Sequence, residues 1–138
     1  PQGYKYFLKM KKKSAEDVTA KYVYANMLRA YEDIIGAAQP KRYQELLLEL
    51  ANDNHTIAQY DYAQYLIYEE DNIDQGLYWL VKAAKVGFTS AEYRLGDILL
   101  NSPSALLMQD KNKAKFWLKR AADKGHAKAQ SKLDRLNK

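Results

Sequence analysis

The chain has 138 residues, no cysteine and a formal net charge of +5 at pH 7. This length suits one compact domain, and the absence of cysteine excludes disulfide bridges and thiolate metal sites. No run of about 18 apolar residues is present, so the sequence predicts no membrane-spanning helix.

No secretion signal opens the chain, which starts at Pro1 rather than at a methionine. We therefore expect a processed product or a shortened chain. We expect a periplasmic or cytoplasmic location, and the missing methionine leads us to favour the periplasm.

Charge is distributed unevenly along the chain. Residues 1–13 carry a net +5, residues 14–110 a net −8 and residues 111–138 a net +8. Basic ends flanking an acidic middle are typical of the solvated caps of a stacked array. Two alternatives stay open for the basic ends, which are binding to nucleic acid and binding to an anionic membrane surface.

The first 13 residues are expected to be an N-terminal extension or a partial helix. Tyr4, Phe7 and Leu8 have helical spacing, but the lysines at 11–13 occupy places that suit small apolar residues. Ser14 followed by Asp17 indicates a helix start with an acid in its first turn, so a longer helix is expected from about residue 15.

A repeated phrase defines four helices, which we call the A helices. Ala20-Lys-Tyr-Val-Tyr-Ala25 and Ala58-Gln-Tyr-Asp-Tyr-Ala63 are nearly identical, and further versions begin at Ala91 and Ala129. Their apolar residues recur on one side of a helix. Five positions after the first alanine of the phrase stands a small residue, which is Ala25, Ala63 or Gly96. We expect this small residue to let a neighbouring helix come close.

Three B helices are predicted between them, over about 41–53, 74–86 and 112–124. Leu46, Trp79 and Trp117 each lie 12 positions before an A-helix alanine, whereas the connection from each A helix to the next B helix varies in length. One fixed and one variable connection are typical of two-helix units stacked in an array. We predict an all-α repeat domain over 14–138 with about seven main helices, in units of about 14–53, 54–86 and 87–124 and a capping helix at 126–137.

The same place after each B helix holds Asn54, Gly87 or Gly125. Glycine adopts the left-handed conformation freely and asparagine tolerates it, so we expect a left-handed helix end at all three. Trp79 and Trp117 are expected in the core. Among the tyrosines we expect Tyr24 and Tyr62 inside, and nearer the surface Tyr60, Tyr65, Tyr68 and Tyr93.

Candidate reaction chemistry is sparse. His55 and His126 follow equivalent helix ends two units apart, roughly 20 Å at the usual helix spacing, which is too far to share a metal ion. We expect them to cap helices or lie at the surface. No glycine-rich phosphate loop or serine–histidine arrangement is present, and Glu69-Glu70-Asp71 is interpreted as a solvated turn. We predict no enzyme, no catalytic residue, no metal site and no cofactor.

The two later units carry a recognisable phrase. Trp79-Leu-Val-Lys-Ala-Ala-Lys-Val-Gly87, with Ala91 and Leu95-Gly96 after it, returns as Trp117-Leu-Lys-Arg-Ala-Ala-Asp-Lys-Gly125, followed by Ala129 and Leu133. This resembles the Sel-one-like repeat (SLR) family, strongly over 74–136 and more weakly over 14–73. The resemblance implies a right-handed alpha-solenoid of stacked antiparallel helix pairs. It also implies adaptor roles, often bacterial, in which a concave face holds other proteins, and it implies no catalytic residue.

The side of each A helix opposite its apolar stripe should then line the groove. Its lining is mixed, amide-rich and partly acidic, which suits a peptide or protein better than a phosphate backbone. We expect partner binding through Asn26, Asp61, Gln64, Tyr68, Arg94, Asp97 and Asn101. The chain is expected to be a monomer or weak dimer. An immunity-type protein that sequesters a toxin or effector enzyme is the first alternative function.

Overall fold

The computed structural model describes residues 2–30, 41–101 and 111–138, and within them it contains eight α-helices and no strand. The helices are α1 (Gln2–Lys13), α2 (Val18–Ala30), α4 (Arg42–Asn52), α5 (Thr56–Tyr68), α6 (Ile73–Lys85), α7 (Thr89–Asn101), α8 (Lys111–Asp123) and α9 (Ala127–Leu136). The all-α prediction is confirmed. Two of the variable connections lie at 31–40 and 102–110, outside the described residues. None of the described helices is long and apolar enough to cross a membrane.

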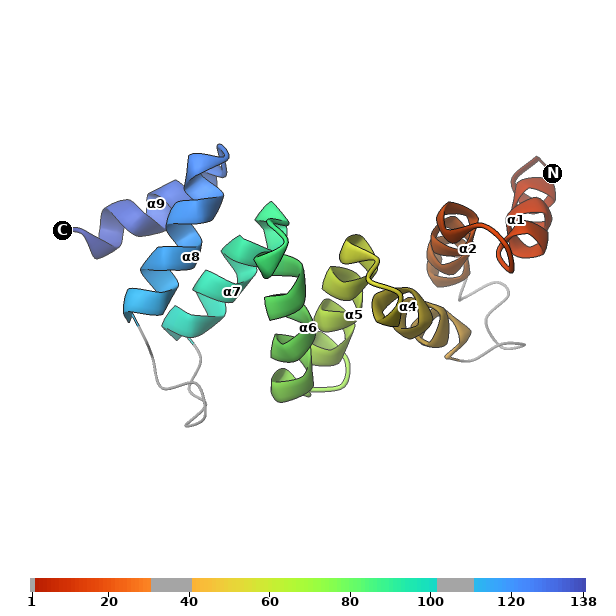
Figure 1. Ribbon diagram of the computed structural model, residues 1–138, viewed down its shortest axis with the longest axis horizontal. Helices are drawn as coiled ribbons and strands as arrows, with labels where there is room; N and C mark the ends of the chain where they lie inside the picture. Colours follow the sequence, from red (N-terminus) through yellow and green to blue (C-terminus); the bar gives the residue numbers. More distant parts are fainter. Residues whose placement is uncertain (1, 31–40, 102–110) are drawn as a thin grey trace.

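The helices are arranged in series. Each packs mainly against its neighbours in the chain, from α1 on α2 to α8 on α9. Figure 1 shows this succession, with the two termini at opposite ends of an elongated molecule. An array in which each unit touches only the next is an alpha-solenoid, as predicted. The A helices are α2, α5, α7 and α9, and the B helices are α4, α6 and α8.

The turn from each B helix to the next A helix has the same construction. Asn54, Gly87 and Gly125 have φ angles of 65°, 94° and 92°, all in the left-handed region. In the first turn the Asn54 amide donates to the Ala51 carbonyl at 3.1 Å, and the His55 amide donates to the Leu50 carbonyl at 3.0 Å. The other two turns repeat both bonds. This is the Schellman pattern, so the prediction that asparagine substitutes for glycine here is confirmed.

Close helix packing depends on small residues at fixed positions. Ala25 and Ala63 are fully buried, and Gly96 is buried at the equivalent place on α7. A Cβ atom added to Gly96 would lie 2.7 Å from Cγ of Leu118 on α8. Gly76 on α6 is as tight, since its Cβ would lie 2.4 Å from Cγ1 of Ile67. The small residues therefore set how near the α5–α6 and α7–α8 pairs approach.

The two tryptophans differ in burial. Trp79 is 6% exposed, and the Tyr62 ring meets it edge-on with centroids 6.0 Å apart. Trp117, which we predicted in the core, is only partly buried at the margin of the same cluster. The position on α7 that corresponds to Tyr62 is Leu95, which has no ring to lay against the indole. Tyr24 is buried as predicted, whereas Tyr62 is only partly buried.

The start of the chain is more regular than expected. Residues Gln2–Lys13 form a full helix in which Phe7 and Met10 are buried, while Leu8 is exposed. The lysines at 11–13 lie in its last turn, where positively charged side chains interact favourably with the helix dipole and so stabilise the helix. The predicted helix start near residue 15 was wrong, because α2 begins at Val18. The Ser14 hydroxyl donates to the Lys11 carbonyl and closes α1, whereas the Asp17 carboxylate accepts from the Ala20 amide and caps α2.

The contact at Gly96 generates a stability prediction. Gly96→Ala should lower the free energy of unfolding by about 1–2 kcal/mol, because overpacking against Leu118 outweighs the better helix propensity of alanine. Urea denaturation followed by circular dichroism measures this. In a Leu118→Ala background only the tight contact with the Ala114 carbonyl at 3.2 Å remains, so the same change should cost less. Equal effects in both backgrounds would contradict the steric explanation.

Candidate partner-binding face

Side chains from successive A helices meet along one face of the array. We call this set the A-helix ladder, and it comprises Tyr22, Asn26, Asp61, Gln64, Tyr68, Arg94, Asp97, Asn101 and Lys132. It includes all seven residues predicted for partner binding. Three side-chain contacts connect α2 to α5, α5 to α7 and α7 to α9. The structure therefore brings the predicted residues together in one continuous row.

The first contact joins α2 to α5 through a tyrosine and a carboxylate. The Tyr22 hydroxyl donates to Oδ2 of Asp61 at 2.6 Å. Burial, followed by this hydrogen bond, raises the pKa of Tyr22 to about 12. Asn26 lies one turn further along α2, and its amide donates to the Tyr22 carbonyl at 3.2 Å. The neutral phenol is thus held between the two helices.

The second and third contacts involve positive charges. The Arg94 guanidinium lies 5.7 Å from the Tyr68 ring centroid, and its Nη1 is 3.6 Å from Oδ2 of Asp97. Asp97 also forms an ion pair with Lys132 of α9 and accepts a hydrogen bond from Asn101 at 2.9 Å. Asp97 is consequently the junction of the C-terminal half of the ladder.

One hollow of about 350 Å³ opens at the N-terminal half of the ladder. Helix α2 contributes Arg29 and α4 contributes Tyr43. The other lining residues belong to α5 or, in the case of Glu69, directly follow it, and they are Tyr60, Asp61, Gln64, Tyr65, Tyr68 and Glu69. We call it the tyrosine pocket. Sequence reasoning placed Asp61, Gln64 and Tyr68 on this face but missed Arg29 and Tyr43. Tyr43 lies on a B helix, whereas the predicted lining comes from one side of the A helices.

Negative charge shapes the electrostatics of the tyrosine pocket. Burial is the main cause that raises the pKa of Tyr43, with Asp61 and Glu69 adding to the rise and Arg29 opposing it. The hydrogen bond from Tyr65 to Glu70, then burial, raises the pKa of Tyr65 to about 12. Carboxylates near the pocket therefore favour the neutral phenols.

Both histidines cap helices, as predicted. Nδ1 of His55 accepts from the Ala58 amide at 3.0 Å, and Nδ1 of His126 accepts from the Ala129 amide at 3.2 Å. Each ring also lies against a tyrosine of the preceding A helix, Tyr22 at 4.9 Å and Tyr93 at 4.3 Å between centroids. Across the described ranges, no three His, Asp or Glu side chains gather as metal ligands.

A buried carboxylate was missed by sequence reasoning. Glu92 on α7 is fully buried, and its oxygens lie 2.8 Å from Nε of Arg120 and 2.8 Å from Nζ of Lys124 on α8. Lys124 also donates to the Gly87 carbonyl at 2.7 Å. The group ties α8 to α7 and to the turn before it. No sequence signal marked it, because the equivalent places on the other A helices hold Lys21, Gln59 and Gln130.

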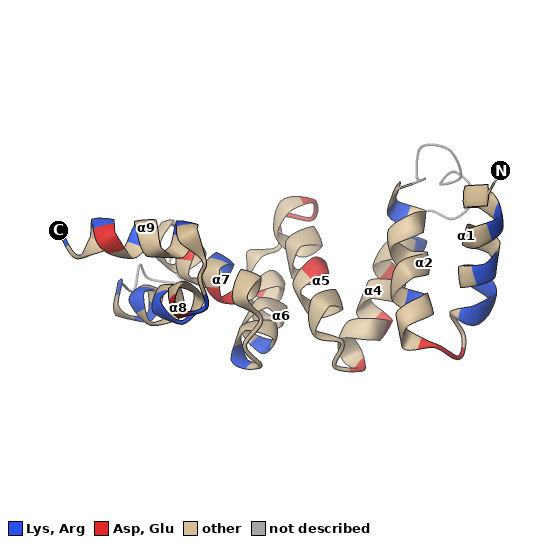
Figure 2. Ribbon diagram, turned by 90° about the horizontal axis from the view of Figure 1, so that it is seen from above, with Lys and Arg blue, Asp and Glu red and all other residues tan. Residues whose placement is uncertain are grey.

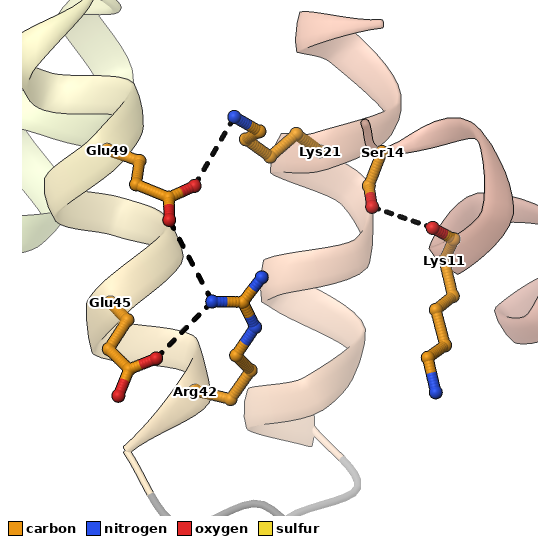
Figure 3. Close-up of polar contacts among 6 residues, drawn as sticks. All are labelled: Lys11, Ser14, Lys21, Arg42, Glu45 and Glu49. Atoms are coloured by element: carbon orange, nitrogen blue, oxygen red, sulfur yellow. Dashed lines mark hydrogen bonds and ion pairs between the residues drawn. The ribbon is translucent and has the colours of Figure 1, made fainter. Parts of the chain in front are cut away.

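The first unit has the same contact with the charges exchanged. Figure 3 shows Lys21 of α2 reaching Glu49 of α4, which also faces Arg42. The Lys21–Glu49 distance is 3.3 Å, and both side chains are partly exposed. Lys21 corresponds in the repeat to Glu92, and Glu49 corresponds to Arg120. The position is therefore used for an A-to-B ion pair in two units.

The buried carboxylate generates a second prediction. Glu92→Gln should cost about 2 kcal/mol, because it weakens two charge-assisted bonds whose cations can still rehydrate. Arg120→Met with Lys124→Met should cost more, about 3–5 kcal/mol, because it leaves Glu92 charged and buried without partners. Adding Glu92→Met to that pair should recover most of the loss. Urea unfolding would contradict this if the triple variant were the least stable.

Tyr22 generates a prediction about pH. Its neutral form is favoured in the folded state, with a pKa of about 12 against 10.0 in the unfolded chain. The resulting stability is complete below pH 10 and is lost as the pH rises towards 12. Wild type should therefore exceed Tyr22→Phe in urea midpoint at pH 9, and the gap should narrow towards pH 11.5. The exposed Tyr78→Phe is the control, and a Tyr22→Phe gap that stays constant would refute the assignment.

Comparisons with known proteins agree with this architecture. The Sel1 repeat profile matches residues 56–88 and 89–126, just over half of the chain. The crystal structure of a Sel1 repeat protein from Oxalobacter formigenes is similar, with 24% identity, a TM-score of 0.74 and coverage of 93% of this chain and 96% of that one. No curated protein matches the chain.

A second similar structure is longer. It is a protective antigen present in uropathogenic Escherichia coli strains, and it displays an SLR fold. The identity is 22% and the TM-score 0.76, over 98% of this chain and 32% of that one, so this chain spans about a third of the antigen's length. These identities show a shared fold. The two matched repeats, which cover more than half of the chain, establish that it belongs to the Sel1 repeat family.

Proposed function

We propose that the chain is a non-enzymatic adaptor that binds a segment of a partner protein along the A-helix ladder. Sel1-repeat proteins commonly serve as protein-interaction scaffolds. The residues proposed for contact are Asn26, Asp61, Gln64, Tyr68, Arg94, Asp97 and Asn101. All of them except Gln64 also make a polar or cation–π contact within the protein, so their side chains are held in place before a partner arrives.

The observation that carries the proposal is a pair of unsatisfied polar atoms on the ladder. Oε1 of Gln64 and Nε of Arg94 are buried, and neither has a hydrogen-bond partner among the residues that the structure describes. Buried polar groups without partners are costly and rare. One is an acceptor and the other a donor, which are the two functions that a peptide backbone complements. Both atoms are covered by the protein itself, so a bound segment would satisfy each of them only once its side chain turns outward.

The distribution of charge supports a protein partner over a nucleic acid. Figure 2 shows that lysine and arginine gather on α1 at one end of the array and on α8 and α9 at the other. Acidic Asp61 and Glu69 lie between these ends on the ladder side. A phosphate backbone needs a continuous basic track, which this arrangement interrupts. Like charges at both ends also oppose end-to-end stacking, which supports a monomer.

Affinity capture from native lysate tests the adaptor proposal. The ladder variant combines Gln64→Lys with Tyr68→Ala, and Tyr68 is 61% exposed. The control combines Gln75→Lys with Tyr78→Ala on the neighbouring helix α6, where both side chains are exposed. Wild type and control should recover the same proteins by mass spectrometry, and the ladder variant should lose them. Recovery of the same proteins by all three would remove the basis of the proposal.

The ladder variant also separates the adaptor proposal from the alternative functions. An immunity-type protein should recover one enzyme whose activity falls on binding. Nucleic-acid binding through the ends should survive the ladder variant and collapse between about 50 and 200 mM salt. Binding to anionic vesicles should likewise be insensitive to the ladder variant.

A further inference from the structure

The tyrosine pocket is equipped for one kind of side chain. Four tyrosines supply aromatic surface, and Asp61 and Glu69 supply carboxylate acceptors. The Tyr22 hydroxyl occupies only Oδ2 of Asp61. A volume of about 350 Å³ is at the small end of the range for ligand sites, roughly 300–1,000 Å³. It suits a single long side chain with its flanking atoms.

Other ligand classes fit the lining less well. A carboxylate or phosphate would be placed beside Asp61 and Glu69, which would repel it. An apolar side chain would bury Asp61 without offering it a donor. An ammonium or guanidinium group carries three or five donors and is also attracted to aromatic faces. The lining therefore selects for positive charge.

Arg29 shows how a cation uses these walls. Its guanidinium lies 5.9 Å from the Tyr43 ring centroid at one side of the pocket. Arg94 stands over Tyr68 on the α7 side at 5.7 Å, and Asp97 offsets its charge. Only Arg29 opposes Asp61 and Glu69 among the lining residues, so the lining has a net charge of −1. Arg29 is an internal competitor for an incoming cation.

We propose that the tyrosine pocket receives a lysine or arginine side chain of the bound partner segment. The inference rests on the proposed function, because it assigns an anchor to the segment that lies along the A-helix ladder. The aliphatic stem lies against Tyr43 and Tyr60. The charged head donates to Asp61 and Glu69.

Titration with capped amino acids tests the pocket without an identified partner. The probes are N-acetyl-arginine methylamide, the lysine equivalent, and the neutral citrulline equivalent, which preserves the shape of arginine. Ring signals of labelled Tyr43, Tyr60 and Tyr65 are followed by NMR. Arginine and lysine should give saturable shifts with low-millimolar Kd values. Citrulline should give none.

Variants of the lining residues test whether the NMR shifts arise from binding in the tyrosine pocket. Asp61→Asn with Glu69→Gln should weaken arginine binding about tenfold or more, because two attractive charges are lost. Arg29→Gln should strengthen it severalfold. The control, Asp53→Asn with Asp74→Asn, removes two exposed carboxylates outside the pocket and should change little. Glu69→Gln alone serves if the double variant loses its circular dichroism signal, since Glu69 is exposed.

The outcomes separate this inference from the adaptor proposal. Equal shifts with citrulline, no saturable shift, or indifference to the pocket variants would overturn the cation anchor, whatever the lysate capture shows. Cation-dependent shifts together with a failed capture would overturn the adaptor and leave the pocket as a cation site.

Discussion

The turn with a left-handed residue is the constraint from which the rest of the array follows. Asn54, Gly87 and Gly125 end a B helix abruptly and place the next residue at the start of an A helix. That next residue is His55, Phe88 or His126. Each of these rings contacts a tyrosine of the preceding A helix, two positions after its repeated alanine. The pairs are His55 with Tyr22, Phe88 with Tyr60 and His126 with Tyr93.

This recurring aromatic contact sets the spacing between successive A helices. Centroid distances of 4.9, 5.2 and 4.3 Å leave little freedom in each step. The same tyrosines take part in the face where we place the partner, since Tyr22 bonds Asp61 and Tyr60 lines the tyrosine pocket. The scaffold and the candidate site therefore share side chains, so a change that loosens a turn should also disturb the face.

Most of the fold could be predicted from interactions between residues that are close in the sequence. Helix positions, the fixed connection and the left-handed residues were predictable, because each depends on side chains within one hairpin. The start of α2 was not, since the hydroxyl of Ser14 can bond a preceding carbonyl as well as a following amide. Trp117 is less buried than Trp79 because its cover depends on a residue of another helix, Leu95 in place of Tyr62. The prediction of burial from the sequence was less accurate where it depends on contacts between helices.

The same distinction holds for the candidate site. Helical periodicity identified the side of each A helix that holds the seven predicted residues, and the family resemblance implied that these sides share one face. The structure brings the residues into one ladder. Arg29 and Tyr43 come from α2 and α4, and only the packing of these helices places them beside α5. Glu92 was equally invisible, because its partners Arg120 and Lys124 lie on the following helix.

The reversed ion pairs have a consequence for folding. In a chain of similar hairpins, α7 could dock on α4, or α2 on α8, and such exchanges are a characteristic failure of repeat proteins. The first exchange would set Glu92 against Glu49, and the second would set Lys21 against Arg120, so each would bring like charges together. Between these two units, attraction arises only when each A helix meets its own B helix. The opposite charges at this recurring position thereby distinguish the first unit from the third and disfavour an exchange between them.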